Sequence, residues 1–533
     1  MGNNSISRKD ALKKLGGLAL GSTILPSSIL RANQTDTEEK SFPNIISKRS
    51  GSKPNILWIT LEGVPLRVLS CYGSSLIDTP NIDRIASQGM QFQNAFTTNA
   101  LCAPSRASLL TGKYDHENGM LTNPGVNRHR GKTPSVFDPH QETFPKIMRR
   151  NGYQTGICGK WHLTNEPNKP SNPGVAGFDY FVFKRYAGGP YYRAKGYLQN
   201  PKLGSTKIVH KEYPGYITDN FTDLAIEGMK QFKQPFMMMV QYFNDHRPFQ
   251  PPHQYSHLYD NVHIPEPSTF WDDYSMRAAP AREAKMRIEY MPDFNPPKDL
   301  TGRQRKQWNY QQFMGHFLGA MKSLDDNIGR LLNYLDDNGL SDNTIVALTS
   351  DHGFFLGEHG WFDKRFMYEP AIRVPWLIHH PGIDNAGSKN DAMVLNIDNA
   401  PTILDLAGLK VPNDMQGVSM LPLINGQKPD KWRDSFYYHY YEFGSPHWVV
   451  PNYGIRTERY KLISYYTINE WELFDLKKDP DEMESLIEWS GYKVHPDYKD
   501  ILNNLVKQLK DLRQKYNDKT GQPVRFWPTG TYD

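Results

Sequence analysis

Six side chains suited to acid–base or metal chemistry stand directly after apolar runs that predict buried strands. In chain order they are Glu62, Lys160, His162, His246, Asp351 and His352. In open α/β sheets, ligands bind beyond the carboxyl ends of the strands, so we expect these side chains to meet at one sheet edge. Carboxylates and imidazoles gathered at such an edge predict a metal-assisted site.

The strands that would position these groups are five short apolar runs. They span residues 55–60, 153–158, 236–243, 344–349 and 374–379. Between Phe313 and Leu335, apolar residues recur at steps of three or four, which predicts a helix with one buried face that Asn338-Gly339 closes. Strands alternating with helices predict an α/β fold, with a mostly parallel sheet sandwiched by helices.

After about residue 425 the pattern changes to that of a smaller α+β unit. Antiparallel strands are predicted over residues 435–441, 453–463 and 470–476, and a closing helix over 498–515. We therefore predict a catalytic domain over 53–425 and a C-terminal subdomain over 426–533. Two long Pro- and aromatic-rich segments, 185–215 and 255–305, lack periodicity and are predicted to be functional loops.

The N-terminal segment is predicted to be an export signal. Residues 1–32 combine a basic start with the apolar run 15–25, which is too short to span a bilayer. A twin-arginine-like route and the general secretory route both stay open, and residues 33–52 are predicted to be a linker. These features predict export to the periplasm or the medium by the cell's export machinery, with no stable membrane span.

The formal charge of +5 depends largely on that segment. Residues 1–32 hold five Lys and Arg and one Asp, so the remainder carries 57 basic and 56 acidic residues instead of 62 and 57. A net charge of +1 disfavours a polybasic nucleic-acid binder. Three cysteines exclude a disulfide scaffold.

One of those cysteines begins the most specific motif in the chain. Residues 102–112 are Cys-Ala-Pro-Ser-Arg-Ala-Ser-Leu-Leu-Thr-Gly, and the pattern continues through Lys113, His116 and Gly119. This window resembles the signature of type I sulfatases, whose Cys-x-Pro-x-Arg cysteine is oxidised to Cα-formylglycine. Further segments resemble the same family, at residues 53–56, 79–83, 159–162, 246–252, 350–353, 364–369 and 470–480.

The resemblance implies an alkaline-phosphatase-like fold and a covalent mechanism. The hydrated formylglycine at residue 102 would attack sulfur through one hydroxyl, and its second hydroxyl would expel sulfate. The family implies that Arg106 and Lys113 hold the diol. It also implies that Lys160 and Lys364 bind sulfate oxygens, with His116 as a further substrate contact. His246 would be the acid for the leaving alcohol, and His162 the base for the second hydroxyl. A formylglycine-generating maturation enzyme is an implied partner.

The chain departs from the family at its metal site. Where two adjacent Asp residues usually follow the first strand, this sequence has Glu62-Gly63, and His352 stands where Asn is common. The implied ligand set is Glu62, residue 102, Asp351 and His352, one carboxylate short. Calcium is the expected divalent cation and magnesium the alternative.

Within the family, segments 363–369 and 456–463 look most like bacterial N-acetylglucosamine-6-sulfatase-type enzymes. We therefore expect an exported sulfatase that hydrolyses O-sulfate esters on a sulfated oligo- or polysaccharide, either a glycosaminoglycan or an algal polysaccharide. Two alternatives stay open. One is a phosphonate or phosphodiester hydrolase of the same superfamily, and the other is a weakly active or non-catalytic saccharide-binding relative, which Gly63 suggests.

Overall fold

The computed structural model describes residues 53–124, 135, 137–138, 140–163, 174, 176–184, 188–194, 197–199, 209–243, 246–382, 386–444, 447–488 and 493–524. The predicted export signal and linker lie outside these residues. Among the described helices, none has the length and apolar character needed to cross a membrane.

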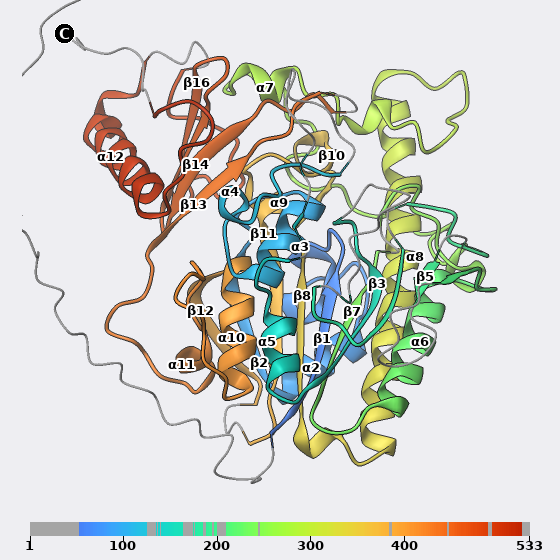
Figure 1. Ribbon diagram of the computed structural model, residues 1–533. Helices are drawn as coiled ribbons and strands as arrows, with labels where there is room; N and C mark the ends of the chain where they lie inside the picture. Colours follow the sequence, from blue (N-terminus) through green and yellow to red (C-terminus); the bar gives the residue numbers. More distant parts are fainter. Residues whose placement is uncertain are drawn as a thin grey trace, which may run out of the picture. The chain divides into compact units, whose positions relative to one another are not determined.

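A ten-stranded sheet forms the centre of the structure (Figure 1), in the order β12-β2-β11-β8-β1-β7-β3-β4-β5-β6. The strands β8, β1, β7, β3 and β4 run parallel, whereas β11 is antiparallel to both of its neighbours. Their bounds are β1 Asn55–Leu61, β2 Met90–Phe96, β3 Gln154–Lys160, β4 Tyr180–Lys184, β5 Tyr197–Gln199, β6 Val209–Lys211, β7 Phe236–Gln241, β8 Thr344–Ser350, β11 Arg373–His379 and β12 Ser388–Leu395. The predicted mostly parallel sheet is confirmed.

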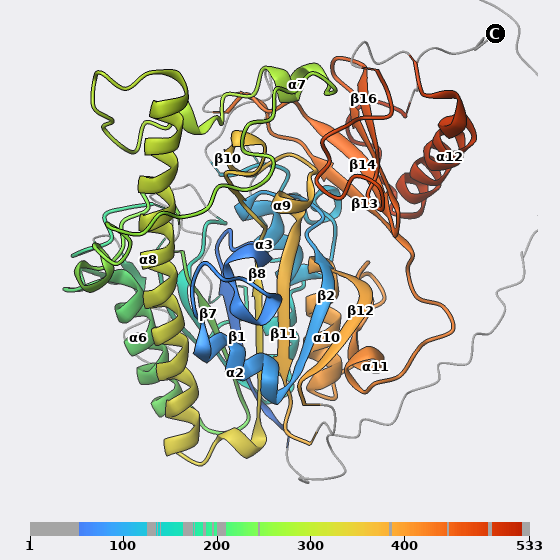
Figure 2. The ribbon, with the colours of Figure 1, turned by 180° about the vertical axis from the view of Figure 1, so that it is seen from behind.

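Helices cover both faces of this sheet (Figures 1 and 2). Because successive residues of a strand point to opposite faces, Leu57 and Ile59 of β1 join one core and Ile56 and Trp58 join the other. The first core includes α2 (Pro80–Gln88), α6 (Ile217–Gln231) and α8 (Gly302–Asp337); the second includes α3 (Cys102–Thr111), α5 (Phe144–Arg150), α10 (Asn399–Leu406) and α11 (Leu421–Ile424). The helix predicted from Phe313 to Leu335 lies inside α8.

The C-terminal part forms a separate four-stranded antiparallel sheet in the order β13-β14-β15-β16. Its strands are β13 (Ser435–Tyr440), β14 (Asn452–Thr457), β15 (Tyr460–Tyr465) and β16 (Glu470–Asp475), and α12 (Lys499–Lys515) follows. The run 453–463, predicted as one strand, is a hairpin instead. Its turn at Glu458-Arg459 lacks the Gly or Asn that normally marks a two-residue turn, and the Thr457 hydroxyl stabilises it by accepting a hydrogen bond from the Tyr460 amide at 2.9 Å.

The segments predicted as long loops are only partly irregular. The first contains the short strands β5 and β6, of which β6 lies at the edge of the sheet, and the second holds a short helix, α7 (Ala279–Arg282), and the first turn of α8. Between β8 and β11 lie the two-residue strands β9 (Phe355–Leu356) and β10 (Phe362–Asp363) and the helix α9 (Glu369–Ile372). A short helix, α4 (Asp115–Asn118), follows α3.

Candidate active site

The register of the two central strands brings the predicted carboxylates together. Leu61, the last residue of β1, pairs with Ser350, the last residue of β8. Glu62 and Asp351 therefore leave the sheet side by side, and the Asp351 amide donates to Leu61 O at 3.1 Å. Both carboxylates are buried, so they need cationic or metal partners.

Cys102 lies beside these carboxylates at the start of α3. Its sulfur lies 2.9 Å from Glu62 Oε1 and 3.4 Å from His352 Nε2. Ligand atoms of Glu62, Cys102, Asp351 and His352 all lie within 4.8 Å of one another. The four residues that the sequence predicts as a ligand set thus form one buried cluster.

Three cationic side chains surround this cluster. Arg106, one turn after Cys102 on α3, donates to Glu62 Oε2 at 2.8 Å and to Asp351 Oδ2 at 3.0 Å. Lys160, the last residue of β3, forms an ion pair with Glu62, and Lys364 Nζ lies 3.5 Å from Glu62 Oε1. Three cations facing two carboxylates leave a positive excess that suits an anionic substrate.

The same charges set the ionisation of the cluster. Burial and Glu62 oppose a thiolate at Cys102, but Lys160, Lys364 and His352 outweigh them and lower the pKa of the unmodified thiol to about 5. Burial also disfavours ionised Glu62, yet Lys160 and Lys364 hold its pKa well below the usual range. Glu62 is therefore an anionic ligand at neutral pH.

The two catalytic histidines predicted from the sequence are held neutral. Burial, then the charge of Lys160, lowers the pKa of His162 well below its usual range, and burial with Lys364 lowers that of His246 to about 4. His162 Nδ1 is buried and has no hydrogen-bond partner among the described residues. Both imidazoles are therefore neutral at neutral pH, and an anion bound near Lys160 would raise the proton affinity of His162.

The backbone conformation and the neighbours of residue 63 leave little room for a second carboxylate after Glu62. Its φ of +63° lies in the left-handed region, and a Cβ there would approach Phe354 Cδ2 to 3.0 Å and His352 Cε1 to 3.3 Å. The Gly63 amide instead donates to Asp351 Oδ1 at 3.1 Å. The donor set still offers two carboxylates and an imidazole in a buried cluster, which fits a divalent cation.

Two residues predicted from the motif lie elsewhere. Lys113 Nζ pairs with Asp414 at 2.5 Å, and Asp414 is largely exposed. His116 Nε2 lies 2.7 Å from Tyr516 O, and its ring stacks on Tyr114. The structure thus brings neither side chain to the cluster, because α3 ends at Gly112, whose φ of +66° turns the chain away.

Replacing Lys113 with alanine is accordingly expected to change kcat/KM by no more than about twofold, since an ion pair with an exposed partner contributes little. Steady-state desulfation kinetics of Lys113→Ala check this. A hundredfold or larger decrease in kcat/KM would show that Lys113 takes part in catalysis and would contradict its position in the structure.

His116 belongs to a buried polar cluster that joins α4 to the C-terminal segment. Asp518 Oδ2 accepts from the Tyr437 hydroxyl at 2.6 Å and lies 2.9 Å from His439 Nδ1, with His116 Nδ1 at 4.0 Å. Burial opposes ionisation of Asp518, but the hydrogen bond from His439 holds its pKa well below the usual range.

We expect Asp518→Asn to lower the free energy of unfolding at pH 7 by about 2–4 kcal/mol, since it breaks a buried charged network. A depressed carboxylate pKa contributes stability above the unfolded value, about 4, and loses it as pH falls below that value. Denaturant unfolding of parent and variant should therefore converge at low pH. A constant difference from pH 7 to pH 3 would refute the assignment.

Sequence reasoning missed several buried groups around the cluster. Gln241, the last residue of β7, accepts from Arg106 Nη1 at 2.5 Å. Tyr438 accepts from the Ala100 amide at 3.2 Å and donates to Arg365 O at 3.1 Å, so the C-terminal sheet braces the segment before Cys102 and the segment of Lys364. Gln241 lies inside the predicted run 236–243, and as the one amide side chain of that run it could have marked the end of the strand.

A charged group beside Lys364 was also missed. Asp363 pairs with Arg365 at 2.6 Å, lies 2.6 Å from His447 Nε2 and lies 3.9 Å from Lys364 Nζ. Burial opposes the Asp363 charge, but Arg365 and His447 outweigh it and hold the pKa well below the usual range. The residues of the aromatic run 437–441 are all buried, so none of them offers an exposed ring to a sugar.

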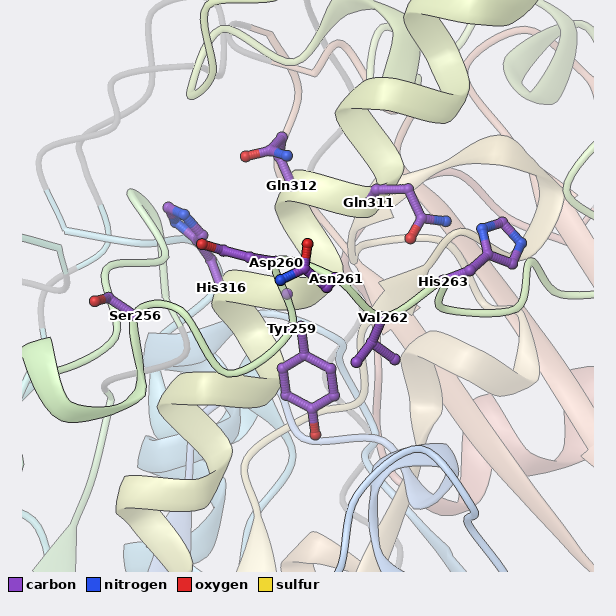
Figure 3. Close-up of a pocket in the computed structure, with 10 residues that line it drawn as sticks. Ser256, Tyr259, Asp260, Asn261, Val262, His263, Gln311, Gln312 and His316 are labelled. Atoms are coloured by element: carbon purple, nitrogen blue, oxygen red, sulfur yellow. The ribbon is translucent and has the colours of Figure 1, made fainter.

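A separate pocket of about 260 Å³ lies between the segment 256–263 and α8 (Figure 3). Among its lining residues, His316 donates from Nδ1 to Phe249 O at 3.0 Å and so braces the loop that follows His246. None of its lining residues belongs to the cluster around Cys102. The cluster, and not this pocket, is the candidate active site.

A helix-borne cysteine, paired carboxylates and surrounding cations at the carboxyl edge of a parallel sheet form a candidate active site that suits an anionic substrate. The sulfatase family model matches residues 54–409, and the model for the C-terminal part of N-sulphoglucosamine sulphohydrolase matches residues 357–515. The chain belongs to the sulfatase family and is a sulfuric ester hydrolase, as the motif predicted.

Three relatives illustrate this kinship. The N-acetylglucosamine-6-O-sulfatase of Bacteroides thetaiotaomicron is 39% identical over 517 residues, which covers 87% of this chain and 88% of that protein. An arylsulfatase of Clostridium perfringens is 28% identical over 87% of this chain and 96% of its own length. The structure of BT4656 in complex with its substrate D-glucosamine-2-N,6-O-disulfate matches with a TM-score of 0.78 and 37% identity, over 88% of this chain and 99% of that one.

Proposed function

We propose that this protein removes the 6-O-sulfate from glucosamine residues of a sulfated glycosaminoglycan. The observation that carries the proposal is the buried cluster of Cys102, Glu62, Asp351 and His352 inside a ring of cations. The substrate class is supported by the names of the relatives with 39% and 37% identity. Algal polysaccharides are the less favoured substrates.

Cys102 is proposed to act after oxidation to formylglycine by a maturation enzyme. Hydration supplies two hydroxyls on one carbon: one forms the bond to sulfur as the sugar oxygen leaves, and the other expels sulfate and restores the aldehyde. Its position in the first turn of α3 favours an ionised hydroxyl, because a helix N-terminus stabilises negative charge. Arg106, one turn along the same helix, adds its positive charge.

Lys160 and Lys364 are proposed to bind the sulfate oxygens and to neutralise the charge that develops during transfer. His246 would protonate the leaving sugar oxygen. Its pKa of about 4 in the free protein reflects burial and Lys364, and a bound sulfate ester offsets that cation and raises the proton affinity of the ring. His162, held neutral, would accept the proton of the second hydroxyl.

Glu62, Asp351, His352 and residue 102 are proposed to hold a divalent cation, with calcium favoured and magnesium the alternative. A cation there would polarise the sulfate group and favour the ionised diol. Burial disfavours a protonated His352, but the charge of Asp351 outweighs it and raises the pKa of that imidazole to about 9. A bound cation would take the place of the proton on this ring. Export to the periplasm or the medium is part of the proposal.

The substrate proposal is tested with matched sulfated glucosamines. The protein, produced together with a maturation enzyme, is incubated with N-acetylglucosamine carrying sulfate at O6, at O3 or at O4, and sulfate release is measured. We expect release from the 6-sulfate at least about a hundredfold faster than from the isomers, because misplacing the reacting atom is costly. Equal rates would overturn the positional assignment.

The superfamily alternative is tested in the same assay format. An aryl sulfate and an aryl phosphodiester with the same leaving group are compared. Faster cleavage of the phosphodiester would identify a phosphodiesterase instead.

A further inference from the structure

A second cationic surface lies at the start of α8. It surrounds a cavity of about 470 Å³ whose lining includes Trp271, Glu289, Tyr290, Arg303, Arg305 and Lys306. Three of these side chains are cationic and one is acidic. None of them belongs to the cluster around Cys102.

The two arginines of this cavity have no carboxylate partner among the residues that the structure describes. Arg303 and Arg305 are exposed, and among the residues that the structure describes neither has an acidic partner within 4.0 Å. Arg84 and Arg330, by contrast, pair with Asp336 and Asp223. Lys306 is buried, donates to Phe270 O at 2.8 Å and lies 3.9 Å from Glu289. The free positive charge of the cavity therefore comes from Arg303 and Arg305.

Aromatic rings stand beside these charges. The Arg303 guanidinium lies 4.5 Å from the Trp271 ring centroid, which favours a fixed orientation of the arginine. Tyr290 is 64% exposed, an unusual exposure for a large aromatic side chain. Exposed aromatic faces pack against the apolar faces of sugar rings, while arginine binds sulfate and carboxylate groups through paired hydrogen bonds. The combination suits a sugar chain that carries acidic groups.

The segment that carries Tyr290 also contacts both sides of the active site. The Met286 carbonyl accepts from the Phe362 amide at 2.9 Å, two residues before Lys364. Asp293 pairs with Arg247 at 2.8 Å, immediately after His246. One short segment, 286–293, thus links the cavity to the loops that hold two proposed catalytic groups.

We propose that this cavity is an accessory binding site for a sulfated polysaccharide, and that it holds a part of the chain that does not react. The proposal rests on the proposed function, because it takes its ligand class from the substrate. Arg303 and Arg305 would bind sulfate or carboxylate groups, and Tyr290 would pack against a sugar ring. The site would favour long chains over single sugars.

The binding test uses full-length Cys102→Ala protein, which does not turn over, and a heparin-derived octasaccharide. We expect Arg303→Ala/Arg305→Ala to raise Kd about tenfold in 50 mM salt, and the difference to shrink in 500 mM salt. The matched control is Lys510→Ala/Lys515→Ala, which removes two exposed charges from α12 that have no acidic partner within 4.0 Å among the described residues, and it should leave Kd unchanged. Tyr290→Ala should weaken the octasaccharide but not an inorganic polyphosphate of similar charge.

Kinetics with active protein separate this proposal from the proposed function. Arg303→Ala/Arg305→Ala should keep the parent rate on glucosamine 6-sulfate and raise KM for the octasaccharide. An unchanged Kd and KM in that variant, with normal activity in the parent, overturns the accessory site alone. If the α12 control raises Kd as much as Arg303→Ala/Arg305→Ala does, or if Tyr290→Ala weakens polyphosphate as much as the octasaccharide, binding is nonspecific charge attraction. Either result also overturns the accessory site. A parent without sulfatase activity overturns the proposed function instead.

Discussion

Cys102→Ala is expected to lower desulfation by about 10⁴-fold or more while leaving the fold intact, because removing a covalent nucleophile leaves only binding and electrostatic effects. Alanine fills the space of the cysteine except for its sulfur, so the buried start of α3 keeps its packing. Sulfate release and thermal unfolding, measured on the same preparation, check both parts of the expectation.

The matched control is Cys158→Ala. Cys158 is also fully buried and lies on β3, two residues before Lys160, yet it is not part of the cluster. This variant should retain activity within a few-fold. Cys102→Ser adds a sharper readout: a single hydroxyl would accept sulfate but lacks the second hydroxyl that expels it. We expect a sulfated protein and no turnover, and multiple turnovers in either Cys102 variant would refute the assigned nucleophile.

Glu62→Gln is expected to lower kcat by about 10³-fold and to raise the concentration of divalent cation needed for half-maximal activity. Glu62 is the carboxylate that contacts Cys102, Arg106, Lys160 and Lys364 together. Its neutral amide would leave three cations facing one carboxylate. The excess positive charge would repel a metal ion, and Lys160 and Lys364 would lose their shared carboxylate.

The control for Glu62 is Glu472→Gln, which also removes a buried carboxylate. Glu472 lies on β16 and accepts from the hydroxyls of Tyr368 and Tyr465, both at 2.8 Å. Glu472→Gln should lower thermal stability without changing the metal dependence. If Glu62→Gln and Glu472→Gln shift the metal titration equally, or if neither shifts it, Glu62 is not a metal ligand.

Much of this site could be predicted because local sequence determines it. Glu62 and Asp351 follow apolar runs, and a parallel pair of strands in register necessarily delivers both to the same edge. Arg106 lies one turn after Cys102, so a helix at the motif places both on one side. Strand ends alone led to Glu62 and Asp351, whereas Cys102 and Arg106 were assigned from the resemblance to the sulfatase motif.

Lys113 and His116 show where motif reasoning fails. A short motif mixes residues that act on substrate with residues that hold the chain, and both kinds occupy fixed positions. Only the turn at Gly112 and the partners Asp414 and Tyr516 separate them. Those partners lie about 300 and 400 residues away in sequence, and no local pattern reveals contacts of that range.

The groups missed entirely share the same cause. Tyr438 of the C-terminal sheet contacts the segment before Cys102, from which it is separated by 338 residues in sequence. Asp363 pairs with His447, which likewise comes from a distant part of the sequence. The boundaries of the predicted domains and the export signal stay predictions.

The central claim is that Cys102 becomes formylglycine, and the mass of one peptide tests it most directly. Trypsin should release residues 85–106, Ile85 to Arg106, with Cys102 as its only cysteine. In protein made together with a maturation enzyme, we predict a peptide that has lost one sulfur and two hydrogens and gained one oxygen relative to the unmodified sequence, and that reacts with a hydrazide probe for aldehydes. An active preparation whose peptide carries only the intact thiol would contradict the account.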